Sequence, residues 1–118
     1  MEAAERAGIR REKIAIDPGL GFGKTPADNW MLALIGWQEL LTLGVPIVLG
    51  ASRKRFLETS PPPRIAPNWQ RLVHSFSGGA HVHPRDPASA ALTYLASRSG
   101  ISVHRVHNVA LAEKALSM

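Results

Sequence analysis

The chain has 118 residues, of which 45% are hydrophobic and 19% are charged, so its composition indicates one folded domain rather than a disordered segment. The absence of cysteine excludes disulfides and thiolate metal sites and suits a reducing compartment, so we expect the protein in the cytoplasm, or in the mitochondrion of a eukaryote. No apolar run approaches the roughly 20 residues of a membrane span, and the net charge of +5 favours anionic partners.

The first half of the chain predicts a strand, a helix and a second strand. Residues 14–17 (IAID) are an apolar run bounded by Pro-Gly, which indicates a buried strand. After a glycine-rich loop, Asp28 is the expected N-cap of a helix that ends near Gly44. Residues 45–50 (VPIVLG) predict the second strand. The apolar stripe of the helix recurs at helical spacing and consists of Trp30, Leu34, Trp37 and Leu41.

The second half begins with a proline-rich stretch. Residues 59–84 are predicted to be an insertion of low regularity, with a short helix over residues 69–76. Asp86 is the expected N-cap of the next helix, with Pro87 at its first position and Gly100 at its end.

A third strand over residues 101–107 and a final helix from the N-cap Asn108 to Leu116 complete an order of strands alternating with helices. This alternation is typical of parallel βαβ units, so the expected fold class is α/β. In such folds ligands bind at the carboxyl ends of the strands. We expect residues 1–118 to form one domain of three segments: residues 14–58 with two strands and a helix, the insertion at 59–84, and the last helix-strand-helix at 85–118.

The first strand end carries DPGLGFGKT, residues 17–25. Gly-Lys-Thr ends a P-loop, but the first glycine of a P-loop would fall at Pro18, and the third glycine of GxGxxG would fall at Lys24. Both nucleotide interpretations therefore fail on spacing. Asp17 can accept paired hydrogen bonds from an amidine-like ring edge, and capping of a glycine-rich turn is its alternative role.

The other two strand ends are basic. Ser52 and Lys54 follow the second strand and can bond a carboxylate, a carbonyl or a ring nitrogen, although a solvated basic loop is the alternative. Arg105 and His107 lie two apart on the third strand, share a face, and can clamp a phosphate or pyrophosphate. His104 on the other face is expected to be a structural or surface residue rather than a ligand. Basic residues are otherwise scattered and aromatics make up 6%, so we expect no nucleic-acid partner. No metal site is expected at the upstream histidines His74, His81 and His83, which lack a further ligand at a set spacing.

Three segments in this order, DPGLGFGKT, PIVLGASRKRF and RVHN, resemble the dihydropteroate synthase family over most of the chain except residues 59–84. The resemblance implies the last three βα units of a (β/α)₈ barrel, a partial barrel. It also implies the family's reaction, in which 4-aminobenzoate displaces diphosphate from 6-hydroxymethyl-7,8-dihydropterin diphosphate to give 7,8-dihydropteroate in folate biosynthesis.

Residue roles follow from the resemblance alone. Asp17 and Lys54 are similar to the residues that hold the pterin ring, and Arg105 and His107 to the pair that binds the departing diphosphate, with Arg105 also flanking the pterin; these four are the expected catalytic residues. Phe22 and Ser52 resemble positions that border the aminobenzoate pocket.

The resemblance also shows departures. Asn108 stands where the family usually has Asp, a mild change because Asn makes the same helix cap. Mg²⁺ is expected on the diphosphate, but the family's magnesium-binding Asn, its further pterin-holding Asp and Asn, and its mobile N-terminal loops have no counterpart here. We therefore expect a segment or truncated product that is inactive without the N-terminal barrel half and that associates with that half or with itself.

Three alternatives remain at this stage. The first is a catalytically incompetent remnant that binds anions or a partner protein. The second is the pterin-binding domain of a methyltetrahydrofolate methyltransferase, and the third, a distant one, is a P-loop nucleotidase. The basic cluster and the terminal RVH favour the synthase over the methyltransferase, because the methyltransferase has no diphosphate to hold.

Overall fold

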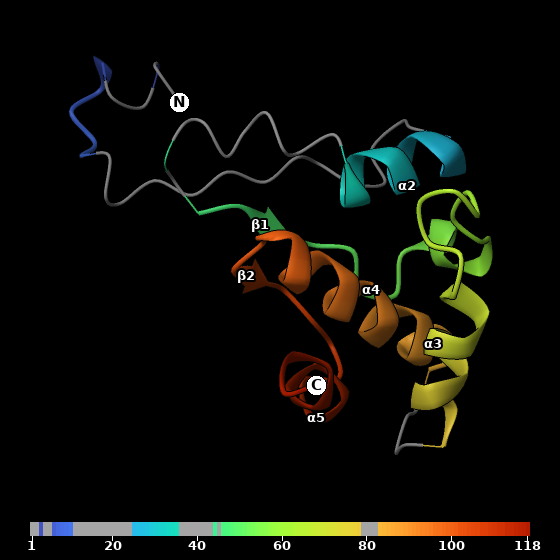
Figure 1. Ribbon diagram of the computed structural model, residues 1–118. Helices are drawn as coiled ribbons and strands as arrows, with labels where there is room; N and C mark the ends of the chain where they lie inside the picture. The colour runs from blue at the N-terminus through green and yellow to red at the C-terminus, as the bar shows by residue number, and fades with distance from the viewer. Residues whose placement is uncertain (1–2, 4–5, 11–24, 36–43, 45, 79–82) are drawn as a thin grey trace.

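The computed structural model describes residues 3, 6–10, 25–35, 44, 46–78 and 83–118 (Figure 1). The predicted strand at residues 14–17, most of the glycine-rich loop and residues 36–43 of the predicted first helix lie outside this part, as do Asp17, Phe22 and His81. In the described part, the elements follow the order α2, β1, η3, α3, α4, β2 and α5. None of these helices has the length and apolar character that a bilayer span requires.

Two short strands form a parallel pair. β1 (Val48–Leu49) and β2 (Val103–His104) are in register with Val48 opposite Val103 and Leu49 opposite His104. The predicted parallel arrangement of the second and third strands is confirmed, but both strands are shorter than their apolar runs. Parallel strands require a crossover, and here α3 (Trp69–Ser77) and α4 (Asp86–Ser99) lie in it.

Helix α4 is the centre of the described part, with α3 and α5 (Val109–Leu116) packed against it (Figure 1). Its sequence contains several small, strongly helix-forming alanines, which let neighbouring helices approach closely. The helix ends at Gly100, whose φ of +120° is accessible to glycine at little cost, as expected from the sequence. Its buried alanines are Ala88, Ala90, Ala91 and Ala96.

An aromatic cluster joins α2 (Pro26–Leu34) to the segment after β1. The Trp30 ring packs edge-on against Phe56 of η3 (Arg55–Glu58) and against Trp69 of α3, with ring centroids 4.9 Å apart in both pairs. The Trp30 Nε1 also donates a hydrogen bond of 2.8 Å to Thr59 Oγ1. The proline-rich stretch therefore contributes to the core through the short helix predicted there.

The predicted starts of two helices are wrong by one to three residues. The N-cap of α2 is Thr25, whose hydroxyl accepts from the Asp28 backbone nitrogen at 3.2 Å, because Pro26 suits the first helical position. Likewise α4 begins with Asp86 inside the helix and Arg85 as its N-cap. The prediction for α5 is confirmed, since Asn108 Oδ1 accepts from the Leu111 nitrogen at 3.1 Å.

Candidate functional site

A pocket lies where β1 and β2 end. It has a volume of about 360 Å³ and includes the side chains of Ser52, Lys54, Arg105 and His107, four of the six predicted site residues. The structure therefore brings the second and third clusters together at adjacent strand ends. The geometry of the first cluster, Asp17 and Phe22, lies outside the described residues.

Arg105 is held at the edge of β1. Its backbone nitrogen donates to the Leu49 carbonyl at 2.9 Å, which extends the parallel pairing by one residue. The guanidinium lies directly over Gly50, where a Cβ atom would come within 2.6 Å of Arg105 Nη2. Glycine at position 50 thus provides the space that this side chain occupies.

A hydrogen-bonded pair joins the two strand ends. Ser52 Oγ accepts from the His107 backbone nitrogen at 3.1 Å and lies 2.9 Å from His107 Nδ1. Two contacts to one hydroxyl fix both the backbone and the ring of His107. The β2 strand ends at His104, so Arg105 and His107 share the pocket as residues of the following loop rather than as neighbours on a strand.

Arg53 separates Ser52 from Lys54 and faces the other way. Its φ of +60° is uncommon for a residue with a side chain, and it lets the chain turn so that Ser52 and Lys54 both line the pocket. The Arg53 guanidinium instead makes a two-pronged ion pair with Asp86, with bonds of 2.8 and 3.2 Å. Hydrogen bonding to that carboxylate raises the pKa of Arg53, which is charged throughout the physiological range.

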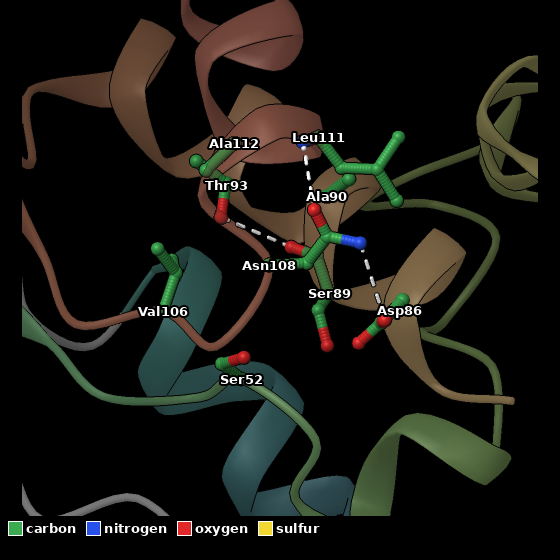
Figure 2. Close-up of a pocket in the computed structure, with 9 residues that line it drawn as sticks. All are labelled: Ser52, Asp86, Ser89, Ala90, Thr93, Val106, Asn108, Leu111 and Ala112. Atoms are coloured by element: carbon green, nitrogen blue, oxygen red, sulfur yellow. Dashed lines mark hydrogen bonds between the residues drawn. The ribbon is translucent and has the colours of Figure 1, made fainter. Parts of the chain in front are cut away.

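Asp86 is a residue near the site that the sequence did not reveal. The sequence predicts that its carboxylate caps a helix, whereas the structure pairs it with Arg53. Asn108 Nδ2 lies 3.3 Å from the same carboxylate (Figure 2). The only sequence signal is a pair of opposite charges 33 positions apart: Arg53 lies between two predicted site residues, and Asp86 is itself the predicted helix cap. Such a long-range pairing depends on the fold and not on local spacing.

His104 lies apart from this pocket, as predicted. It is partly buried, and its Nε2 lies 3.1 Å from the Ile101 carbonyl, while Nδ1 has no hydrogen-bond partner within the described part of the chain. Burial lowers the pKa of His104, and the Ile101 contact opposes that shift. A neutral, structural imidazole fits these surroundings.

The chemistry of the pocket suits an anion. Lysine and arginine are permanent donors at neutral pH, and arginine binds phosphate oxygens through a fixed fork of N–H groups. Mg²⁺ prefers carboxylate and carbonyl oxygens, which this set of side chains does not supply. Among the residues that the structure describes, no cluster of three His, Asp or Glu could hold a metal ion.

The sequence profile of the family described as pterin binding enzyme matches residues 1–107. The dihydropteroate synthase of Mycobacterium leprae is 40% identical over 121 residues, which cover 100% of this chain and 37% of that protein. That of Streptococcus pyogenes serotype M6 is 34% identical over 108 residues, or 92% of this chain and 35% of that protein. The chain thus spans little more than a third of the length of these relatives.

Solved structures show the same similarity. Xanthomonas albilineans dihydropteroate synthase with 4-aminobenzoic acid has a TM-score of 0.72 at 36% identity, and the match covers 98% of this chain and 36% of that one. The Anaplasma phagocytophilum enzyme with bound 6-hydroxymethylpterin-monophosphate has a TM-score of 0.72 at 28% identity, and the match covers 98% of this chain and 38% of that one. The α/β arrangement described above is therefore one that these barrel enzymes contain.

Proposed function

Because the chain belongs to the pterin-binding enzyme family, we propose that it is the C-terminal part of a dihydropteroate synthase and forms the last three βα units of its (β/α)₈ barrel. The observation that carries the proposal is the pocket in which Ser52, Lys54, Arg105 and His107 meet at two adjacent parallel strand ends. Ligand sites of barrel enzymes occur at this end of the strands.

The proposed reaction joins 6-hydroxymethyl-7,8-dihydropterin diphosphate and 4-aminobenzoate. The amine nitrogen forms a bond to the methylene carbon, the bond from that carbon to the diphosphate oxygen breaks, and the amine loses one proton. Negative charge grows on the leaving diphosphate, so cations positioned beside it lower the barrier. Arg105 and His107 take this role, and Lys54 holds the pterin ring together with Asp17.

Ser52 and Phe22 are assigned to the aminobenzoate side of the site. The hydroxyl of Ser52 already bonds His107, so it also orients the imidazole toward the leaving group. Mg²⁺ belongs to the diphosphate of the substrate in this proposal, and no residue of the described pocket is assigned as its ligand. The remaining parts of the barrel, from a longer polypeptide or a partner chain, complete the site.

A joined protein tests the proposal. This chain is fused to the part of the Mycobacterium leprae relative that it does not match, and dihydropteroate formation is measured from the two substrates. Asp17→Ala and Arg105→Ala are each expected to abolish turnover. Arg98→Ala is the matched control, because Arg98 is an exposed arginine at the far end of α4, over the Tyr94 ring. Full turnover in both site variants rejects the assignment.

A second candidate is a catalytically incompetent remnant that binds anions or a partner protein. The chain spans little more than a third of the length of each relative reported above. Calorimetry with the dihydropterin diphosphate separates the two: no binding by the joined protein favours the remnant. The relatives reported above are all named for dihydropteroate synthase, which favours that enzyme over a methyltransferase.

A further inference from the structure

The first residue of α4 carries a buried charge for which the proposed reaction has no use. Asp86 is 1% exposed, and it is the one ionisable residue among the largest fully buried side chains of the described part. A carboxylate removed from water is costly unless charged and polar groups surround it. Its partners therefore indicate what the carboxylate does.

The partners of Asp86 come from both loops of the candidate site. Arg53, between Ser52 and Lys54, donates to the two carboxylate oxygens at 2.8 and 3.2 Å. Asn108, which directly follows His107, donates to Oδ2 at 3.3 Å and accepts from Leu111 with its own oxygen, as Figure 2 shows. One carboxylate thus contacts the loop after β1 and the loop after β2.

A second anchor holds the loop after β1 to the same helix. The Arg53 backbone nitrogen donates to Ser89 Oγ at 2.9 Å, and Ser89 Oγ donates to the Arg85 carbonyl at 2.7 Å. The Arg85 side chain in turn donates to the Arg53 carbonyl at 2.9 Å. A left-handed residue such as Arg53 persists only where its surroundings determine it, and here the backbone and the side chain are both bound.

The space beside Asp86 excludes a direct role in substrate binding. The cavity there has a volume of about 10 Å³ and is lined by residues including Ser52, Asp86 and Asn108 (Figure 2). Such a volume is close to the minimum that one water molecule needs. A pterin or a diphosphate does not reach the carboxylate by this route.

We propose that Asp86 is a positioning residue, which locks the loops after β1 and β2 to the start of α4 and so sets the separation of Lys54 from Arg105 and His107. The effect on substrate rests on the proposed function, whereas the effect on the two loops does not. A carboxylate that only stabilised the start of α4 would leave both loops unchanged when it is replaced.

The test uses Asp86→Asn in the joined protein, which keeps the size of the side chain and removes its charge. Amide hydrogen exchange is followed in residues 52–54 and 107–108 and, for comparison, in α3. Exchange is expected to increase in both loops but not in α3. The affinity for inorganic pyrophosphate, measured by calorimetry, is expected to fall about tenfold, a typical coupling between a supporting residue and a binding site.

Glu58→Gln is the matched control. Glu58 is also a carboxylate paired with an arginine at the start of α4, since Arg85 Nε donates to it at 3.1 Å, but its side chain is 59% exposed. Hydrogen bonding from Arg85 lowers the pKa of Glu58. Glutamine keeps a side-chain oxygen that accepts from Arg85, so the bond from Arg85 to the Arg53 carbonyl is retained, and both loop exchange and pyrophosphate affinity are expected to stay unchanged.

Asn108→Ser gives a second, milder test. Serine still caps α5, but it cannot donate from the position of Nδ2 to Asp86. Exchange is expected to increase at residues 107–108 while α5 stays protected. If Asp86→Asn does not fold, this variant decides the question by the same measurements.

The outcomes separate the two proposals. The positioning role is overturned if exchange in the two loops of Asp86→Asn is unchanged, or if exchange in α3 increases equally. It is also overturned if the joined protein binds pyrophosphate and Asp86→Asn leaves that affinity unchanged. If the unsubstituted joined protein binds no pyrophosphate and forms no dihydropteroate, the proposed function is rejected. Loop exchange in Asp86→Asn then decides the positioning role by itself.

Discussion

At the scale of single residues, the contact between Gly50 and Arg105 shows how a residue without a Cβ atom shapes the pocket. The guanidinium occupies the space that any Cβ at position 50 would fill. The atoms that would be displaced belong to the end of a flexible side chain and not to the backbone, so the fold can yield at low cost. A larger residue at position 50 should therefore change the geometry of the pocket and leave the stability of the fold nearly unchanged.

Gly50→Ala is expected to weaken pyrophosphate binding by about tenfold, because a displaced arginine loses its paired hydrogen bonds to the anion. The thermal midpoint is expected to change little. Gly78→Ala is the control, since a Cβ there meets no atom within 4 Å. Calorimetry and a melting curve on both variants check the prediction; equal affinities in the two would contradict it.

His104 gives a prediction about pH. Burial lowers its pKa in the folded state, so the unfolded chain takes up a proton first as the pH falls through the usual histidine value of about 6.5. Stability is therefore complete above that value and decreases from about pH 7 towards pH 5.

His104→Gln removes this titration and is expected to flatten the decrease of unfolding free energy in that window. Urea titrations of the joined protein at several pH values measure it. Gln70→Ala changes an exposed α3 residue that carries no titrating group, and it is expected to leave the slope of the profile unchanged. A profile that keeps its slope in His104→Gln would refute the assignment.

At the scale of elements, the aromatic cluster explains how the proline-rich stretch is fixed. Trp69 is 5% exposed and packs edge-on against Trp30, so α3 is attached to α2 through two large rings. The prolines that precede it restrict the conformations of the unfolded chain, which reduces the entropy lost on folding. The part of the chain that looked least regular in sequence thus contains a structural helix.

Trp69→Ala is expected to lower the unfolding free energy by roughly 3–5 kcal/mol, the usual loss for a buried aromatic ring. Arg71→Ala, two residues further along the same helix and exposed, is expected to change it by less than about 0.5 kcal/mol. Denaturant titration of both variants in the joined protein makes the comparison. Similar losses in both would mean that α3 is not attached through this ring.

Local patterns predicted the elements better than their connections. Gly100 and Asn108 end and begin helices by local chemistry, and both predictions are confirmed. Asp86 followed by Pro87 looks like a cap and first turn, yet the helix begins one residue earlier, and the carboxylate pairs with Arg53, which is distant in sequence. The strands are shorter than their apolar runs, since pairing depends on a partner strand and not on composition alone.

In the candidate site, too, the sequence indicates which residues lie at the strand ends but not which of them bond to each other. Lys54 and Arg105 were expected at neighbouring strand ends because parallel strands end on one side of a sheet, and they share a pocket. The bond between Ser52 and His107 joins residues 55 positions apart and has no local signal. The position of Asp17 relative to them stays a prediction.

At the scale of the whole molecule, the described sheet has a single pair of strands, and each strand has one neighbour in this part of the chain. Several large apolar side chains around β2 and α5 are also exposed, including Val103 at 40% and Val109 at 58%. Exposed apolar side chains of this kind favour association with other chains. A complementary part of a barrel would cover them.

By itself, the chain is expected to sediment as dimers or larger species at micromolar concentration. Fusion to the unmatched part of the relative is expected to give a protein that sediments as one species of uniform size. Analytical ultracentrifugation measures both. Val109→Lys, a change on an exposed helix position, should reduce the association. A sharp, monomeric and reversible melt of the chain alone would contradict the prediction.

The left-handed backbone of Arg53 limits which residues can replace it during evolution. Glycine there would relieve the strained dihedral but leave a buried acid without its cation, whereas lysine would keep a charge and lose the forked contact. Either single replacement is penalised by folding itself, whether or not the protein turns over substrate. The arginine at position 53 would therefore persist after the loss of activity in a duplicated copy, and its presence indicates an intact fold more directly than a working enzyme.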